Sequence, residues 1–102
     1  MSLQKKVLKS RPVSKVTFRL PPKAAAGAEN VSLVGEFNEW RPDATPMTRL
    51  KSGEFKVSLD LATGQEYQFR YLINGRTWEN DWEADKYLPS GIAGAENSVV
   101  VL

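Results

Sequence analysis

The segment EYQFRYLINGRTW, residues 66–78, decides the fold class of this chain. From Tyr67 to Ile73 the aromatic and aliphatic side chains occupy every second position, which places them on one face of a strand. Asn74-Gly75 follows, and both residues accept the positive φ of a tight hairpin turn. We therefore predict a strand that ends at Ile73, a reversal at Asn74-Gly75, and a short return strand that carries Thr77 and Trp78.

The same alternation continues on both sides of this hairpin. Further strands are expected at residues 15–20, 31–35, 55–61 and 98–102, each next to proline, glycine or another turn residue. The polar segment 79–96 is expected to be a long loop, and no segment has the apolar period of a long helix. The chain is therefore predicted to be an all-β antiparallel sandwich. Its expected core holds Phe18, Leu33, Phe55, Val57, Leu59, Phe69, Tyr71 and Val99.

Length and composition exclude several classes of protein. The chain has 102 residues, of which 41% are hydrophobic and 25% are charged, and this suits one globular domain with one core. It contains no Cys and no His, which removes thiol chemistry, the commonest general base and the commonest metal ligand. We therefore expect no catalytic residues, no cofactor and no metal site.

Charge and hydropathy give further expectations. The net charge of +2 is too small to indicate a polyanion partner. Basic residues crowd the N-terminus, so we expect residues 1–12 to be a solvated basic leader and residues 13–102 to be the domain. No apolar run is long enough to span a bilayer, and residues 1–10 lack the apolar stretch of a signal peptide. We expect a cytoplasmic protein with no membrane partner.

Two tryptophans are candidates for a binding surface. Trp40 and Trp78 lie among polar residues next to predicted turns, so each is expected to be partly exposed. An exposed indole is a flat apolar plate with one N–H donor, which matches the C–H face and the hydroxyl edge of a sugar ring. Arg70, on the outward face of the preceding strand, and Asn97, at the start of the last strand, could bond sugar hydroxyls.

Three of these residues also have a plainer interpretation. Trp40 could fold back as a lid on the core, Arg70 could lie on a solvated strand face, and Asn97 could bond its own backbone in a turn.

The acidic residues at positions 79, 81, 83 and 85 could form a calcium loop or a glycosidase pair. Lys86 occupies the position where a calcium loop needs glycine, and a small sandwich offers no deep cleft. A solvated acidic edge is the favoured interpretation.

The motifs together resemble carbohydrate-binding module family 48, which includes isoamylase N-terminal domains and the glycogen-binding domain of the AMP-activated protein kinase β subunit. The resemblance covers residues 13–102 and rests on Gly35-Glu36-Phe37-Asn38-Glu39-Trp40, Pro46-Met47, Gly53-Glu54-Phe55, Tyr67-Gln68-Phe69-Arg70-Tyr71, Asn74-Gly75, Trp78 and Asn97-Ser98-Val99-Val100. It implies an immunoglobulin-like early-set sandwich that binds α-1,4-glucans such as glycogen, starch or maltooligosaccharides without catalysis.

The resemblance also implies site residues. In the kinase domain two tryptophans stack on the glucan while a lysine and an asparagine bond its hydroxyls. These positions match Trp40, Trp78 (allowing one extra residue in the hairpin), Arg70 and Asn97. A leucine and a threonine of that domain align near Ala93 and Ala95, so both of those side chains are missing here. Trp82 has no counterpart, and it either extends the platform or packs under the acidic segment.

Two other functions remain open from the sequence. Aromatic side chains beside Arg70 could stack nucleic-acid bases, but the small net charge and the acidic segment disfavour phosphates, so no nucleic-acid partner is expected. The chain could instead dock on a glucan-metabolising enzyme, or on itself, without binding sugar. Relatives fused to catalytic domains pack on them, which makes this the main alternative.

Overall fold

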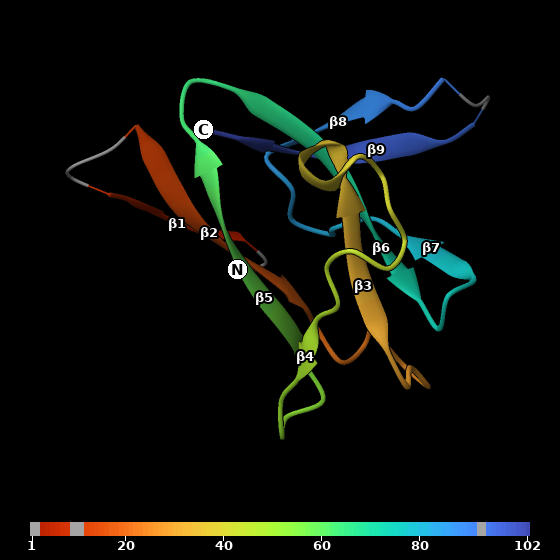
Figure 1. The fold of residues 1–102 in the computed structure, drawn as a ribbon. Helices are drawn as coiled ribbons and strands as arrows, with labels where there is room; N and C mark the ends of the chain where they lie inside the picture. The colour runs from red at the N-terminus through yellow and green to blue at the C-terminus, as the bar shows by residue number, and fades with distance from the viewer. Residues whose placement is uncertain (1–2, 9–11, 92–93) are drawn as a thin grey trace.

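The structure is a computed structural model that describes residues 3–8, 12–91 and 94–102, and it consists of two antiparallel sheets (Figure 1). One sheet has the order β1-β2-β5-β4, and the other has the order β3-β6-β9-β8 with β7 paired to β6. The strands are β1 (Leu3–Val7), β2 (Val13–Leu20), β3 (Val31–Gly35), β4 (Thr48–Arg49), β5 (Phe55–Ala62), β6 (Glu66–Ile73), β7 (Thr77–Glu79), β8 (Lys86–Pro89) and β9 (Glu96–Val101). A 3-10 turn, η1 (Glu36–Asn38), follows β3. The predicted all-β immunoglobulin-like sandwich is therefore confirmed.

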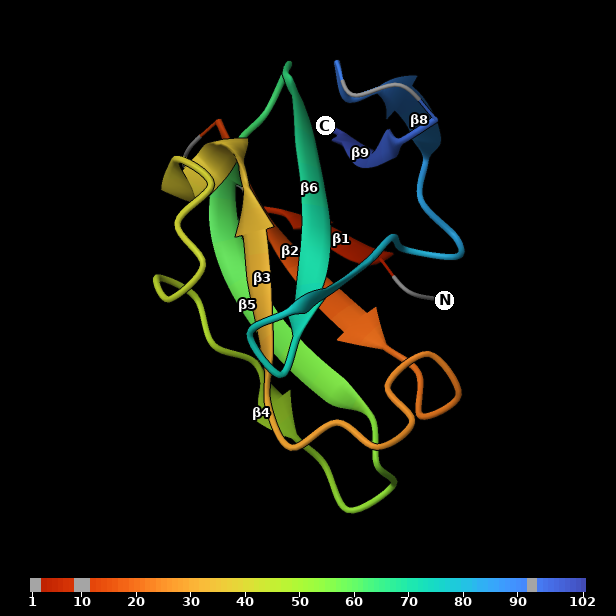
Figure 2. The same cartoon turned by 90° about the vertical axis from the view of Figure 1, so that its right-hand side faces the viewer.

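The two sheets pack face to face, with β3 and β6 in front of β2 and β5 in the view of Figure 2. The inward side chains of β2, β5 and β6 form the core, in which Phe18 and Phe69 meet edge to face at 5.1 Å between ring centroids. Phe69 makes a similar contact with Tyr71 at 5.7 Å. Such aromatic pairs add about 0.5–1.5 kcal/mol beyond the area that they bury. The core therefore fixes β6, which also carries the centre of the candidate site.

Three members of the predicted core lie elsewhere or are less buried. Val57 and Leu59 are only partly buried against the core. Val99 is fully buried, but it pairs with Gln68 on the outer face of the second sheet, while Val100 faces the core. The last strand is apolar at every position from Val99 to Val101, so its sequence does not show which residues face inward.

The N-terminal segment contributes a strand that the sequence did not predict. Leu3–Val7 pairs with β2 as an edge strand, and Leu3 is buried against the core. This part of the expected basic leader therefore belongs to the first sheet. Lys5 and Lys6 are nevertheless exposed, as expected for a solvated segment, and Lys9 and Arg11 lie outside the described residues.

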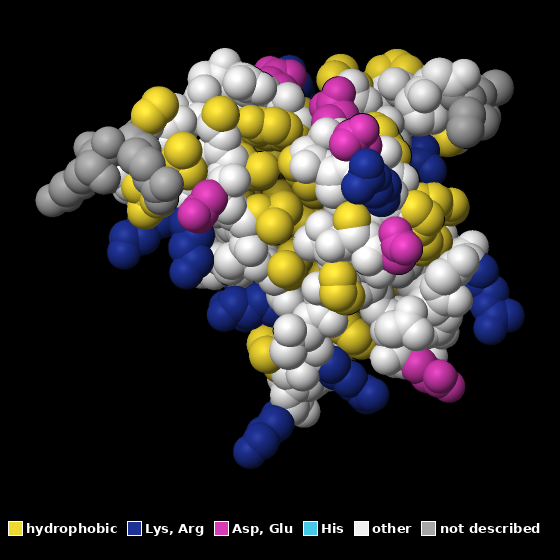
Figure 3. Space-filling model, in the orientation of Figure 1, with side chains coloured by type: hydrophobic (Ala, Val, Ile, Leu, Met, Phe, Trp, Pro, Cys, Tyr) yellow, Lys and Arg dark blue, Asp and Glu magenta, His cyan; other side chains and the backbone are white. Residues whose placement is uncertain are grey.

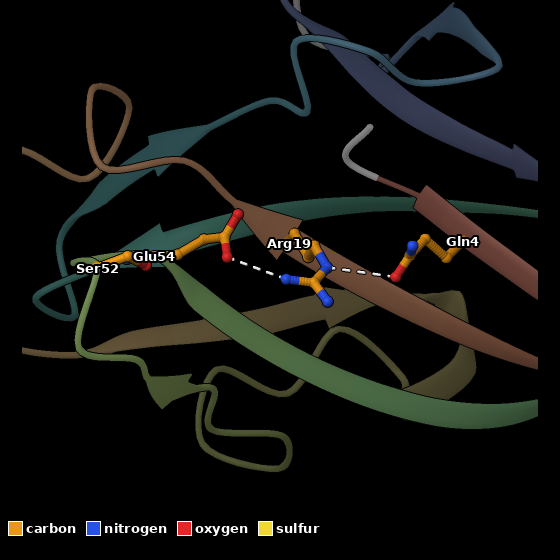
Figure 4. Close-up of polar contacts among 4 residues, drawn as sticks. All are labelled: Gln4, Arg19, Ser52 and Glu54. Carbon is orange, nitrogen blue, oxygen red and sulfur yellow. Dashed lines mark hydrogen bonds and ion pairs between the residues drawn. The ribbon is translucent and has the colours of Figure 1, made fainter.

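A chain of polar contacts on the first sheet links β1 and β2 to the turn before β5 (Figure 4). Arg19 donates from Nη1 to Glu54 Oε1 at 2.9 Å and from Nε to Gln4 Oε1 at 3.3 Å. The backbone N–H of Glu54 donates to Ser52 Oγ at 3.3 Å, which orders the turn before β5. These contacts hold β1 and the start of β5 against β2.

The predicted hairpin after β6 is present. Asn74 and Gly75 have left-handed φ values of 53° and 69°, and Arg76, whose N–H donates to Ile73 O at 3.1 Å, completes a three-residue hairpin loop. The turn returns the chain as β7, where Trp78 pairs with Leu72 of β6. The long loop predicted over residues 79–96 is only partly correct, because it contains β8, which pairs with β9. No helix in the described part of the chain is long and apolar enough to cross a membrane.

Candidate functional site

The four predicted site residues line one groove on the outer face of the second sheet. The groove has a volume of about 320 Å³ and is lined by Trp40, Arg70, Trp78, Ser90 and Asn97. Trp40 is 37% exposed and Trp78 is 45% exposed, so neither indole is folded into the core as a lid. The structure therefore brings these residues together, and whether they bind a ligand remains a prediction.

The loop that presents Trp40 begins with a close contact between backbones. Gly35 pairs with Phe69, and a Cβ added at Gly35 would lie 2.6 Å from Gln68 O and 2.8 Å from the Cβ of Phe69. Only glycine fits such an approach. The next residue, Glu36, accepts the N–H of Gln68 through its side chain at 2.6 Å, which ties the loop to β6 where β3 ends.

Asn38 holds the remainder of this loop. Its Oδ1 accepts the N–H of Gly35 at 3.0 Å, and its Nδ2 donates to Leu33 O at 2.9 Å and to Thr45 Oγ1 at 3.0 Å. Asn38 therefore joins both ends of the loop and the segment that follows it. The sequence motif around Trp40 is thus explained by the contacts of Gly35, Glu36 and Asn38.

Trp40 itself stands in a strained conformation. Glu39 and Trp40 both have φ of 58°, in the left-handed region, and the N–H of Trp40 donates to Gly35 O at 2.9 Å. A non-glycine residue in this region costs on the order of 1 kcal/mol. Such conformations cluster at functional sites and persist only where surrounding contacts impose them, which here are the hydrogen bonds of the loop. The loop holds the indole at the groove.

Arg70 and Asn97 form the polar centre of the groove. Arg70 Nε donates to Asn97 Oδ1 at 2.8 Å, and Asn97 Nδ2 donates to Gln68 Oε1 at 2.9 Å. Asn97 is only 8% exposed and lies within β9, so its side chain orients Arg70 rather than closing a turn. No described residue accepts a hydrogen bond from the Nη groups of Arg70, so these donors are available at the groove.

The floor of this face is apolar and packed. Val34, Leu72 and Val99 are at most 5% exposed although they lie outside the core between the sheets. Trp78 pairs with Leu72, which lies two residues after Arg70 on the same face of β6. A rigid floor limits the motion of the residues above it, so the groove is largely preformed.

Ser90 is the groove residue that the sequence did not indicate. It follows β8, and its Oγ donates to Ala95 O at 3.1 Å across the turn that leads to β9. Serine in a turn is usually a local backbone partner and carries no functional signal. Ala95 belongs to the same turn, and Ala93 lies outside the described residues.

The sequence suggested that the whole acidic segment is solvated, but part of it is buried in the structure. Asp81 is 1% exposed, and its Oδ2 accepts the Tyr71 hydroxyl at 2.7 Å. Burial first, and then the charge and hydrogen bond of Asp81, raise the pKa of Tyr71 well above its ordinary value. Trp82 is 54% exposed, donates to Glu79 at 2.6 Å, and does not line the groove. No acidic cluster among the described residues could hold a metal ion.

A second hollow of about 240 Å³ lies at the first sheet and has a different character. It is lined by Gln4, Lys5, Lys6, Lys15 and Thr17, and none of these described residues is aromatic. Lys and Arg side chains gather along the side of the molecule formed by β1 and β2 (Figure 3). Single-stranded nucleic acid is bound where cations and aromatic platforms share one surface. Here the lysines and the tryptophans line different hollows, which disfavours that function.

Comparison with known proteins gives one family. Residues 9–88 match carbohydrate-binding module 48, the isoamylase N-terminal domain. The match includes Trp40, Arg70 and Trp78 and ends before Asn97. A search of curated proteins found no match. Because the family match covers well over half of its residues, the chain belongs to carbohydrate-binding module family 48.

Proposed function

We propose that this chain binds linear α-1,4-glucans, such as glycogen, starch and maltooligosaccharides, in the groove between Trp40 and Trp78. The observation that carries the proposal is the meeting of two exposed indoles with Arg70 and Asn97 in one groove. These side chains come from separate parts of the chain, the loop after β3 and the strands β6, β7 and β9. Their convergence supports a shared ligand better than separate structural roles do.

The chemistry of the groove suits a neutral sugar. Each indole offers an apolar plate to the C–H face of a glucose ring, and stacking on it contributes on the order of 1 kcal/mol beyond area burial. Arg70 can donate from its Nη groups to vicinal hydroxyls, and Ser90 adds a hydroxyl to the groove. We expect a Kd weaker than about 10 μM, because an open groove buries little of a ligand. The leucine of the kinase domain that aligns near Ala93 is also missing here.

The same residues support binding without catalysis. None of the five described residues that line the groove carries a carboxyl group, and the sequence contains no His. Glycoside hydrolysis requires a pair of carboxyl groups on either side of the scissile bond. The purified protein should therefore release no reducing sugar from amylose.

A titration with maltoheptaose, followed by intrinsic tryptophan fluorescence, tests the proposal. Trp40→Ala and Trp78→Ala should each weaken binding by about fivefold or more, and the double variant should not bind. Trp82→Ala is the matched control, because Trp82 is the most exposed of the three tryptophans and lies outside the groove. No binding by the wild type at millimolar maltoheptaose would leave the docking-module alternative in its place.

A further inference from the structure

The groove crosses a break between two strands that lie end to end. β6 pairs with β3 along one edge; along the other edge it pairs with β7 at residues 71–73 and with β9 at residues 66–69. Arg70 lies at the break, with Trp78 of β7 on one side and Asn97 of β9 on the other. The spacing of these side chains therefore depends on how the end of β7 is joined to the start of β9.

Asn80 and Asp81 make this junction. Asn80 Nδ2 donates to Glu96 O at 3.0 Å, and Ser98 Oγ donates to Asn80 Oδ1 at 2.8 Å. The same Ser98 hydroxyl accepts the N–H of Asp81 at 2.8 Å. The two residues that follow β7 are thus bonded directly to the first residues of β9.

The carboxylate of Asp81 locks this junction to β6. Its Oδ2 accepts the Tyr71 hydroxyl at 2.7 Å, and its Oδ1 accepts the N–H of Glu83 at 2.8 Å. Asp81 and Ser98 are at most 1% exposed, and Tyr71 is fully buried. A buried charge is costly unless it is fully hydrogen-bonded. A displacement of β7 relative to β9 would break these hydrogen bonds, so the network holds the two strands in one arrangement.

We propose that Asp81 is the positioning residue of the groove, which fixes Trp78 relative to Arg70 and Asn97 at the spacing that a glucan chain requires. The proposal rests on the proposed function, since it assigns a role in glucan binding to a buried residue that does not line the groove. Trp40 does not depend on the hydrogen bonds of Asp81, because Gly35 and Asn38 hold its loop through separate contacts.

Two variants break the lock in different ways. Asp81→Asn replaces one acceptor oxygen by an NH₂ group, and Tyr71→Phe removes the donor while keeping the ring that packs on Phe69. Each should weaken maltoheptaose binding by about tenfold in protein shown to be folded by circular dichroism. Asp60→Asn is the matched control, the same substitution at an exposed residue of β5 in the other sheet, and it should keep the wild-type affinity.

Double variants separate positioning from general loosening. In the Tyr71→Phe background, Trp78→Ala should cost less than it does in the wild type, because Trp78 is already displaced, whereas Trp40→Ala should keep its full cost. Wild-type affinity in both single variants, or equal coupling to Trp40 and Trp78, would overturn the positioning role.

A measurement without ligand keeps this test independent of the proposed function. In the NMR spectrum of free Tyr71→Phe protein, the indole N–H signal of Trp78 should shift or broaden while that of Trp40 stays in place. An unchanged Trp78 signal would overturn the positioning role whether or not the wild type binds glucan. A shifted Trp78 signal in a protein whose wild type binds no glucan would overturn the proposed function alone.

Discussion

Replacing Gly35 by alanine should destabilise the protein strongly, for a steric reason. Gly35 has φ of −170°, an extended conformation that any residue adopts, so the substitution adds no backbone strain. The new methyl group would lie 2.6 Å from Gln68 O, and 2.8 Å from both the Phe37 ring and the Cβ of Phe69. Two of these three atoms are fixed by the pairing of β3 with β6, so a rotamer change cannot relieve the overlap.

The magnitude follows from the cost of overpacking. Inserting a methyl group into a packed interior costs about 1–3 kcal/mol, and because the neighbours are fixed, we expect a cost of about 3 kcal/mol for Gly35→Ala. For a domain of this size the midpoint of thermal unfolding should fall by about 12–24 °C. Because Trp40 donates to Gly35 O, the same change should also weaken maltoheptaose binding by the folded protein.

Thermal and urea unfolding followed by circular dichroism measure this effect. Gly27→Ala is the control, because Gly27 has φ of 75° and no atom within 4 Å of the added Cβ, so only the backbone term of about 1 kcal/mol applies. If Gly35→Ala lowers the stability no more than Gly27→Ala does, the predicted steric overlap at Gly35 is refuted.

Three further predictions concern the groove and its supports. Asn38→Ala removes three hydrogen bonds and should lower stability by about 2–3 kcal/mol in urea unfolding; a cost below about 0.5 kcal/mol would show that the loop is held otherwise. Maltoheptaose affinity should change less than twofold between 50 and 500 mM NaCl because the sugar is neutral, whereas a steep decline would indicate an anionic ligand. Because its pKa is raised, Tyr71 keeps its proton in the folded state, whereas an unfolded tyrosine loses it at about pH 10, so stability should fall as pH rises above that value. Urea unfolding should show this alkaline decline reduced in Tyr71→Phe, and an equal decline in both proteins would contradict the assignment.

The sequence predicts the central hairpin well because two local signals agree there. The alternation that ends at Ile73 and the Asn74-Gly75 turn both specify the same reversal, and no tertiary contact has to be known. β1 is not predicted because Gln4, Lys5 and Lys6 interrupt its apolar pattern. It forms a strand only because it pairs with β2. A short edge strand of this kind depends on its neighbour more than on its own residues.

The candidate site divides in the same way. The groove residues are predicted because the motif around Trp40 and the return strand of the hairpin mark exposed indoles. Asp81 is missed because the regular spacing of acidic residues suggests one solvated face, whereas the chain turns inward after Asn80 and buries the carboxylate against Tyr71. Ser90 is missed because its approach to the groove depends on the β8–β9 hairpin, a long-range arrangement.

The three indole N–H signals in a two-dimensional NMR spectrum test the central claim most directly, since the chain has 3 tryptophans and two of them line the groove. On addition of maltoheptaose, the signals of Trp40 and Trp78 should shift together and saturate with one Kd, while the signal of Trp82 should stay within the line width. Assignment by the three single Trp→Ala variants identifies each signal. No shift of Trp40 and Trp78 at millimolar maltoheptaose, or a shift confined to Trp82, would contradict glucan binding in the groove.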